Sequence, residues 1–174
     1  VGGKINVAKI LDEESYGMCC SKEELETDEN IICGNADVYW DEDILELLVN
    51  NDGKTIMLSD VTRAQTGDYF FHCKDGKIEK YGKELVPEER TCEYVGLAHI
   101  KKEFIPTFKE QVEKLVELGE YNLWWENALY SLTDRYPIYS KDVENHFWAE
   151  VDYIEDYERI KSVIEKKEKI ILKK

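Results

Sequence analysis

The apolar positions of this chain follow two periods, one that predicts strands and one that predicts helices. Short apolar runs bounded by turn residues predict a series of strands, at 29–33, 55–59, 68–73, 78–81, 93–100, 138–143 and 147–151. Apolar residues spaced three and four positions apart predict four helices, at 41–49, 106–118, 123–132 and 154–169. The mixture of periods indicates an α/β fold.

Two local signals refine this α/β prediction. The pair Asp75-Gly76 separates two of the predicted strands, which is typical of a tight β-hairpin turn. The strand, helix and strand between residues 29 and 59 follow one another in the order of a βαβ unit. We therefore expect a sheet that is partly parallel and flanked by helices.

The composition favours one folded domain. The chain has 174 residues, of which 43% are hydrophobic, and it includes four tryptophans. A chain of this length can bury a sizeable core, and this hydrophobic content argues against disorder. Because no repeat and no Pro-rich or Gly-rich linker divides the sequence, we expect a single domain over residues 1–174.

The net charge of −15 limits the classes of partner that the chain can bind. Nucleic acid and anionic membranes repel such a body, so neither is an expected partner. A nucleotide can still bind if a divalent cation lies between its phosphates and the protein's carboxylates. No apolar run is long enough for a membrane span, and the five cysteines form no CxxC motif. We expect thiols in a reducing compartment, the cytoplasm.

Asp37 is the first candidate for metal binding. It follows the predicted strand 29–33, and ligands of open α/β sheets collect at the carboxyl ends of strands. Many loops of this kind carry an Asp as a helix cap, but Asp41 is better placed for that role. This assignment leaves the Asp37 carboxylate available for a ligand.

Glu150 and Asp152 form the second candidate. They lie two positions apart in an extended segment, so their side chains point to the same face. Two carboxylates on one face repel each other unless a cation or a donor lies between them. Mg²⁺ suits this arrangement because it takes oxygen ligands and keeps only one or two protein carboxylates. The alternative is a solvated edge strand paired with nearby lysines.

Five segments, taken in order, resemble motifs of the nucleotidyltransferases that make CDP-alcohols and nucleotide sugars. They lie at 31–41, 75–83, 93–97, 123–129 and 148–157. The first resembles the family's hydrophobic strand that runs into a Gly/Asp motif, and the last matches its closing Trp-x-Glu-[IV]-Asp segment. The most similar subfamily is that of bacterial phosphocholine cytidylyltransferases.

The resemblance implies a Rossmann-like sheet and a magnesium-dependent activity. In such an enzyme a phosphate or phosphonate oxygen of the acceptor attacks the α-phosphorus of CTP, and pyrophosphate leaves. The resemblance gives Asp37 and Asp152 the role of Mg²⁺ ligands, and gives Lys83 a contact to the incoming phosphate. Catalysis would then rest on positioning and charge neutralisation. An ordinary surface lysine is the alternative for Lys83.

The remaining candidates suit an acceptor that carries an amine, such as a phosphorylated amino-alcohol. Trp124, Trp125 and Tyr153 offer aromatic faces to an ammonium group, and Glu126 and Glu150 balance its charge. Only one tryptophan of the pair can face a cleft, and core packing is the alternative for both. Glu93 is a further candidate for substrate contact, or else a partner of Lys83. A sugar-1-phosphate acceptor is the competing hypothesis.

The N-terminal part departs from the family pattern. Nucleotidyltransferases of this family open with a strand and a Gly-rich loop that cradle the triphosphate. Here Val1-Gly2-Gly3-Lys4 has glycines but no preceding strand. We therefore expect a fold that is incomplete in its N-terminal half, with one unpaired sheet edge that favours a homo-oligomer or another partner. A non-catalytic relative that binds a nucleotide-linked ligand or a partner subunit is the third hypothesis.

Overall fold

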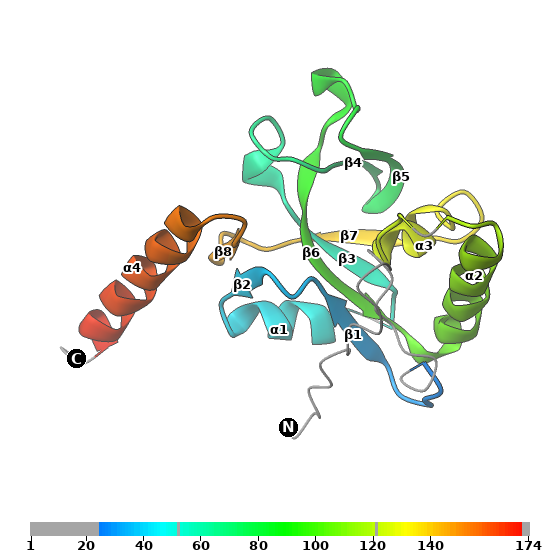
Figure 1. Ribbon diagram of the computed structural model, residues 1–174, viewed down its shortest axis with the longest axis horizontal. Coiled ribbons are helices and arrows are strands. Elements are labelled where there is room, and N and C mark those ends of the chain that lie inside the picture. The colour runs from blue at the N-terminus through cyan, green and yellow to red at the C-terminus, as the bar shows by residue number, and fades with distance from the viewer. Residues whose placement is uncertain (1–24, 52, 121, 172–174) are drawn as a thin grey trace.

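The computed structural model describes residues 25–51, 53–120 and 122–171 (Figure 1). Its centre is a six-stranded sheet crossed by the long strand β6. The strands lie in the order β1 (Ile31–Gly34), β6 (Cys92–Ile100), β3 (Ile56–Asp60), β7 (Tyr139–Asp142), β5 (Lys77–Gly82) and β4 (Phe70–Lys74). The Val1-Gly2-Gly3-Lys4 segment lies outside the described residues.

The sheet is mixed, as the sequence predicts. Strand β6 runs antiparallel to both β1 and β3, and β3 pairs in parallel with β7. Strands β1 and β3 therefore run in the same direction, as a βαβ unit requires, but β6 lies between them. Strand β1 forms one edge of the sheet among the described strands.

The hairpin predicted around Asp75 and Gly76 is also present. Strands β4 and β5 pair antiparallel, and the two turn residues have φ angles of 50° and 74°. Two successive positive φ angles are the geometry of the tight turn that suits the twist of a hairpin, and Asp-Gly is a preferred sequence for it.

Helices cover both faces of the sheet. Side chains alternate along β3, so Ile56 and Leu58 share one core with α1 (Asp43–Val49), while Met57 belongs to the other. That second core is filled from α2 (Ile105–Glu117) and α3 (Glu126–Tyr130). Three short 3-10 helices complete the connections, at Val61–Arg63, Pro87–Glu89 and Lys102–Phe104.

Two helices begin or end differently from the prediction. Helix α1 begins at Asp43, and no side chain caps its first turn, so the prediction that Asp41 is the cap is wrong. The Asp41 carboxylate instead accepts hydrogen bonds from Phe147 N and Lys167 Nζ. Helix α3 is shorter than 123–132, and the hydroxyls of Ser131 and Thr133 bond to carbonyls of its last turn, which competes with helix continuation.

A small second sheet lies beside the first. Strand β2 (Val38–Trp40) pairs antiparallel with β8 (Trp148–Glu150), and Val38 is opposite Glu150. Helix α4 (Ile154–Ile171) follows β8 and extends away from the main sheet (Figure 1). Within the described part of the chain, no helix combines the length and the apolar character that a bilayer crossing needs.

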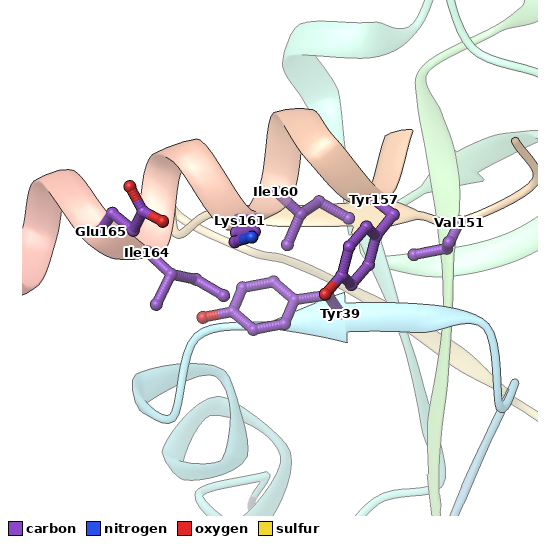
Figure 2. Close-up of a pocket in the computed structure, with 7 residues that line it drawn as sticks. All are labelled: Tyr39, Val151, Tyr157, Ile160, Lys161, Ile164 and Glu165. Atoms are coloured by element: carbon purple, nitrogen blue, oxygen red, sulfur yellow. The ribbon is translucent and has the colours of Figure 1, made fainter. Parts of the chain in front are cut away.

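A groove of about 350 Å³ separates α4 from the small sheet (Figure 2). Tyr39 of β2 forms its floor, and Tyr157, Ile160 and Ile164 of α4 face it. The far end of α4 is tied back by the bond between Lys167 and Asp41. Helix α4 is therefore connected to β8 at its first end and bonded to Asp41, the residue after β2, near its last turn.

Candidate active site

Asp37 lies in the turn between β1 and β2, with an exposed side chain. Its backbone carbonyl accepts a hydrogen bond of 2.8 Å from Val151 N, which extends the pairing of β2 with β8 by one step. This bond fixes the Asp37 backbone beside the segment that carries Glu150 and Asp152.

The carboxylates around this bond act on one another. The pKa of Glu150 is raised to about 7, first by burial and then by the charges of Asp152 and Asp37. These charges act only over short distances in a protein. The structure therefore brings Asp37, Glu150 and Asp152 to one place, although more than a hundred residues separate the first from the last.

Glu126 is the buried member of the same group. It begins α3, its residue is only 1% exposed, and its pKa is raised to about 7, mainly by burial. A hydrogen bond from Asn35 opposes this shift, while the charges of Asp37 and Glu150 add to it. Glu126 Oε2 has no hydrogen-bond partner among the described residues. A cation or a donor of a ligand would satisfy this oxygen.

Asn35 and Trp125 link α3 to the Asp37 loop. The indole nitrogen of Trp125 donates to Asn35 Oδ1 at 2.9 Å, and Asn35 N donates to Gly96 O at 2.9 Å. Trp125 is 8% exposed and packs in the core with α2 and α3. Of the predicted pair, only Trp124 is exposed, at 50%. Trp125 thus contacts the site through Asn35.

Glu93 lies on β6 and is also buried. Its Oε1 accepts a 2.8 Å hydrogen bond from Asp68 N, and Arg63 Nη1 is 3.8 Å from its Oε2. Burial raises the pKa of Glu93, partly offset by the bond from Asp68 and by Arg63. Gly67 permits this arrangement, since a Cβ at residue 67 would lie 2.2 Å from Glu93 Cδ. The partner of Glu93 is Arg63 rather than Lys83.

Lys83 and Trp124 meet at the surface. Lys83 Nζ lies 3.2 Å from the Asp68 carboxylate and 5.9 Å from the centre of the Trp124 ring. Asp68 is in turn one of the charges that raise the pKa of Glu150. The charge of Asp68 therefore links Lys83 to Glu150, the carboxylate of β8.

A cluster of tyrosines adjoins Glu126. The ring of Tyr130 is stacked between those of Tyr69 and Tyr81, with centroid distances of 5.1 and 4.8 Å. Tyr94 meets Tyr130 edge-on, and its hydroxyl has no partner among the described residues. The charge of Glu126 raises the pKa values of Tyr69, Tyr94 and Tyr130, after burial, which is the larger cause.

Tyr153 lies at the start of α4 and is 72% exposed. Its backbone N donates to the Asp156 carboxylate at 3.2 Å, an interaction that caps the helix. Substrate binding by the ring of Tyr153 stays a prediction.

Comparison with solved structures places this arrangement in a known fold. The inositol-1-phosphate CTP transferase from T. maritima aligns at a TM-score of 0.58 and 15% identity, over 77% of this chain and 54% of that one. The CTP:phosphocholine cytidylyltransferase from Streptococcus pneumoniae aligns at 0.56 and 16% identity, over 76% and 57%. A UDP-glucose pyrophosphorylase complexed with UDP-glucose aligns at 0.57 and 13% identity, over 83% and 59%. The chain has the nucleotidyltransferase fold.

The chain spans only a little more than half the length of these nucleotidyltransferases. No family model and no curated protein matches its sequence. The prediction of a nucleotidyltransferase sheet with flanking helices, present only in part, is confirmed.

The residues of this nucleotidyltransferase fold that suit a metal ion are few. Within the described ranges, no three His, Cys, Asp or Glu side chains are grouped so as to hold an ion by themselves. Asp37 and Asp152 both have exposed side chains, and the bond from Val151 N to Asp37 O places their backbones beside each other. This donor set fits Mg²⁺, which usually keeps several waters and takes phosphate oxygens beside one or two carboxylates.

Several residues of the site were not predicted from the sequence. Arg63 joins Glu93 to β8, because its Nη2 donates to Trp148 O at 3.1 Å and its guanidinium lies 4.1 Å from the centre of the Trp148 ring. The other missed residues are Asn35, Asp68 and the four clustered tyrosines. Only Asn35 had a signal in the sequence, because it precedes Asp37 by two positions in the same short loop. The tyrosines lie on separate elements, so no spacing connects them.

Proposed function

We propose that this chain is a magnesium-dependent nucleotidyltransferase domain of the cytidylyltransferase type. It would transfer CMP from CTP to a phosphorylated or phosphonate amino-alcohol, resembling phosphocholine, and release pyrophosphate. The observation that carries this proposal is the meeting of Asp37 with Glu150 and Asp152 at the pairing of β2 with β8, in a nucleotidyltransferase fold.

In this proposal Asp37 and Asp152 hold the Mg²⁺. When bound, the ion neutralises phosphate charge and orients the nucleotide. The protein would need it, because the carboxylates of this site would otherwise repel a triphosphate. The carboxylates already repel one another, since the charges of Asp152 and Asp37 add to the effect of burial in raising the pKa of Glu150.

The chain's own residues would position the two substrates. An oxygen of the acceptor phosphate forms a bond to the α-phosphorus of CTP, and the bond from that phosphorus to the bridging oxygen breaks. Pyrophosphate carries away the electron pair of the broken bond. Lys83 would contact the acceptor phosphate, as its ammonium lies at the surface between Asp68 and Trp124. Positioning of this kind supplies much of the rate in such transfers.

An amine on the acceptor agrees with the charges of the site. Glu126 and Glu150 would face the ammonium, and Glu126 Oε2 is without a described partner. Trp124 offers an exposed ring, on which Lys83 already makes a cation contact. Glu93 and Tyr153 remain proposed contacts to the acceptor. Trp125 would position the Asp37 loop through Asn35.

The test is a pyrophosphate-release assay on the full gene product, with a panel of nucleoside triphosphates and phosphorylated acceptors. We expect release with CTP and an amino-alcohol phosphate, dependent on Mg²⁺. Asp37→Asn should lower the rate at least a hundredfold, and Asp28→Asn, an exposed carboxylate in the segment before β1, is the matched control. Titration calorimetry should show that CTP binds only with the metal. Metal-independent binding that survives Asp37→Asn would contradict the proposal.

A sugar-1-phosphate acceptor is the second candidate, favoured by the structural similarity to a UDP-glucose pyrophosphorylase. The same panel decides between the two, since it includes sugar phosphates with UTP and dTTP. A non-catalytic relative is the third candidate, favoured because this chain aligns with only a little more than half of the length of the two solved cytidylyl-transferring proteins. Metal-dependent CTP binding without turnover over the whole panel would select it.

Three further properties belong to the same proposal. Residues 1–174 would form one nucleotidyltransferase-like domain, located in the cytoplasm. The domain would associate through the edge strand β1 with another copy or with a segment that completes the sheet. Size-exclusion chromatography with light scattering would measure that association.

A further inference from the structure

Two cysteines lie on paired strands of the main sheet with their sulfur atoms close together. Cys73 lies on β4 and Cys92 on β6, and their Sγ atoms are 3.9 Å apart. A disulfide needs about 2 Å between the sulfurs, so rotation of the two side chains must close a gap of roughly 2 Å. The two thiols are neighbours that are not bonded.

The backbone around this pair is firmly held. Phe71 of β4 is paired with Cys92, and Thr91 accepts a 3.0 Å hydrogen bond from Cys73 N while donating to Phe71 O at 2.9 Å. The pairing of β4 with β5 shifts between His72 and Cys73. A shift of this kind re-aims a side chain, and here Cys73 meets a residue that is not directly opposite it.

The surroundings favour one thiolate within the pair. The hydrogen bond with Cys73 lowers the pKa of Cys92, and bonds with Ser59, Thr91 and Ser140 lower it further, against the effect of burial. The same pairing raises the pKa of Cys73. Cys92 is 2% exposed, whereas Cys73 is only partly buried. Cys73 is therefore the sulfur that a small molecule in solution reaches first, and Cys92 lies directly behind it.

From this geometry we propose that Cys73 and Cys92 are a modification site, a dithiol that a low-molecular-weight disulfide oxidises reversibly to an intramolecular disulfide. Cys73 attacks the small disulfide, forms a mixed disulfide and releases one small thiol. Cys92 then attacks Cys73 Sγ, the mixed bond breaks, and the second small thiol leaves. The protein loses two hydrogens and the small disulfide gains them. In a reducing compartment the pair stays a dithiol, and such bridges are transient.

The bridge would join β4 to β6 next to the candidate active site, because Glu93 follows Cys92 and is paired with Phe70. It would also close the segment that holds β5 and Lys83 into a loop. This inference stands on the strand geometry and does not depend on the proposed function.

The test is to incubate the folded wild-type chain with oxidised glutathione, quench with acid, alkylate and map peptides by mass spectrometry. We expect the Cys73–Cys92 disulfide as the main product, reversed by dithiothreitol. The same reaction in urea should give a statistical mixture over the five cysteines. In Cys73→Ser, Cys92 should remain fully alkylatable.

Two results would overturn the inference. One is a folded chain in which both thiols stay reduced or Cys73 carries only glutathione. The other is the same distribution of products in the folded and the urea-unfolded chain. Since the mapping uses the wild type, a variant that fails to fold does not affect either outcome.

Discussion

The substitution Glu126→Gln tests how much the burial of this carboxylate costs the folded protein. Glu126 is 1% exposed, and burial raises its pKa from 4.5 to about 7. The folded state therefore holds the proton more tightly than the unfolded chain does. As a result the contribution of Glu126 to the free energy of unfolding falls as the pH rises from about 4.5 to about 7, and stays constant above that range.

The size of this effect follows from the pKa difference. One pKa unit corresponds to about 1.4 kcal/mol, so ionisation of Glu126 costs the folded state about 3 kcal/mol at pH 8. Gln has the same shape and stays neutral, and its carbonyl can still accept the hydrogen bond from Asn35. The variant should be more stable than the wild type by about 3 kcal/mol at pH 8, and equally stable at pH 4.

Urea unfolding followed by tryptophan fluorescence between pH 4 and pH 8 measures this difference. Glu113→Gln is the matched control, because Glu113 is exposed on α2 and its carboxylate is hydrated in both the folded and the unfolded state. A stability difference that is the same at every pH would refute the reasoning. So would a wild type that is the more stable protein at pH 8, since Glu126 would then be stabilised as an anion by a partner.

Two further substitutions test the packing of the site and of α4. Gly67→Ala places a methyl 2.2 Å from Glu93 Cδ, and we expect the free energy of unfolding, measured with urea, to fall by about 1–3 kcal/mol. Ala64→Gly is the nearby control, because it adds no atom that could clash with Glu93. Lys167→Ala removes the bond to Asp41, which should speed proteolytic cleavage in α4 but change global stability by less than about 1 kcal/mol, because Lys167 is 44% exposed. An unchanged cleavage rate would show that the groove contacts alone hold the helix.

The sequence predicted most elements because their signals are local. The Asp75-Gly76 turn and the amphipathic run of α2 each carry their own evidence within a dozen residues. The order of the strands is a different kind of information. That β6 separates β1 from β3 depends on pairing between residues 31 and 100 and between residues 57 and 98, and no local pattern specifies it.

The difference between local signals and tertiary contacts also explains which residues of the candidate site were predicted. Asp37 and Asp152 were found through motifs, and each motif lies within one segment. Arg63 reaches Glu93 and Trp148 from a 3-10 helix, and the three stacked tyrosines come from three elements. Such contacts are tertiary, so the sequence offered no spacing that predicts them. Trp124 and Trp125 could not be told apart until the packing of α3 showed which one is buried.

The hydrogen bond between Asp37 and Val151 has a consequence for how the chain is made. During translation, residue 37 leaves the ribosome long before residue 152 is added. A ligand that needs both aspartates cannot assist the early part of the chain, which must reach a protected state on its own. Under the proposed function, such a ligand could stabilise the folded form only after β8 has emerged and paired with β2.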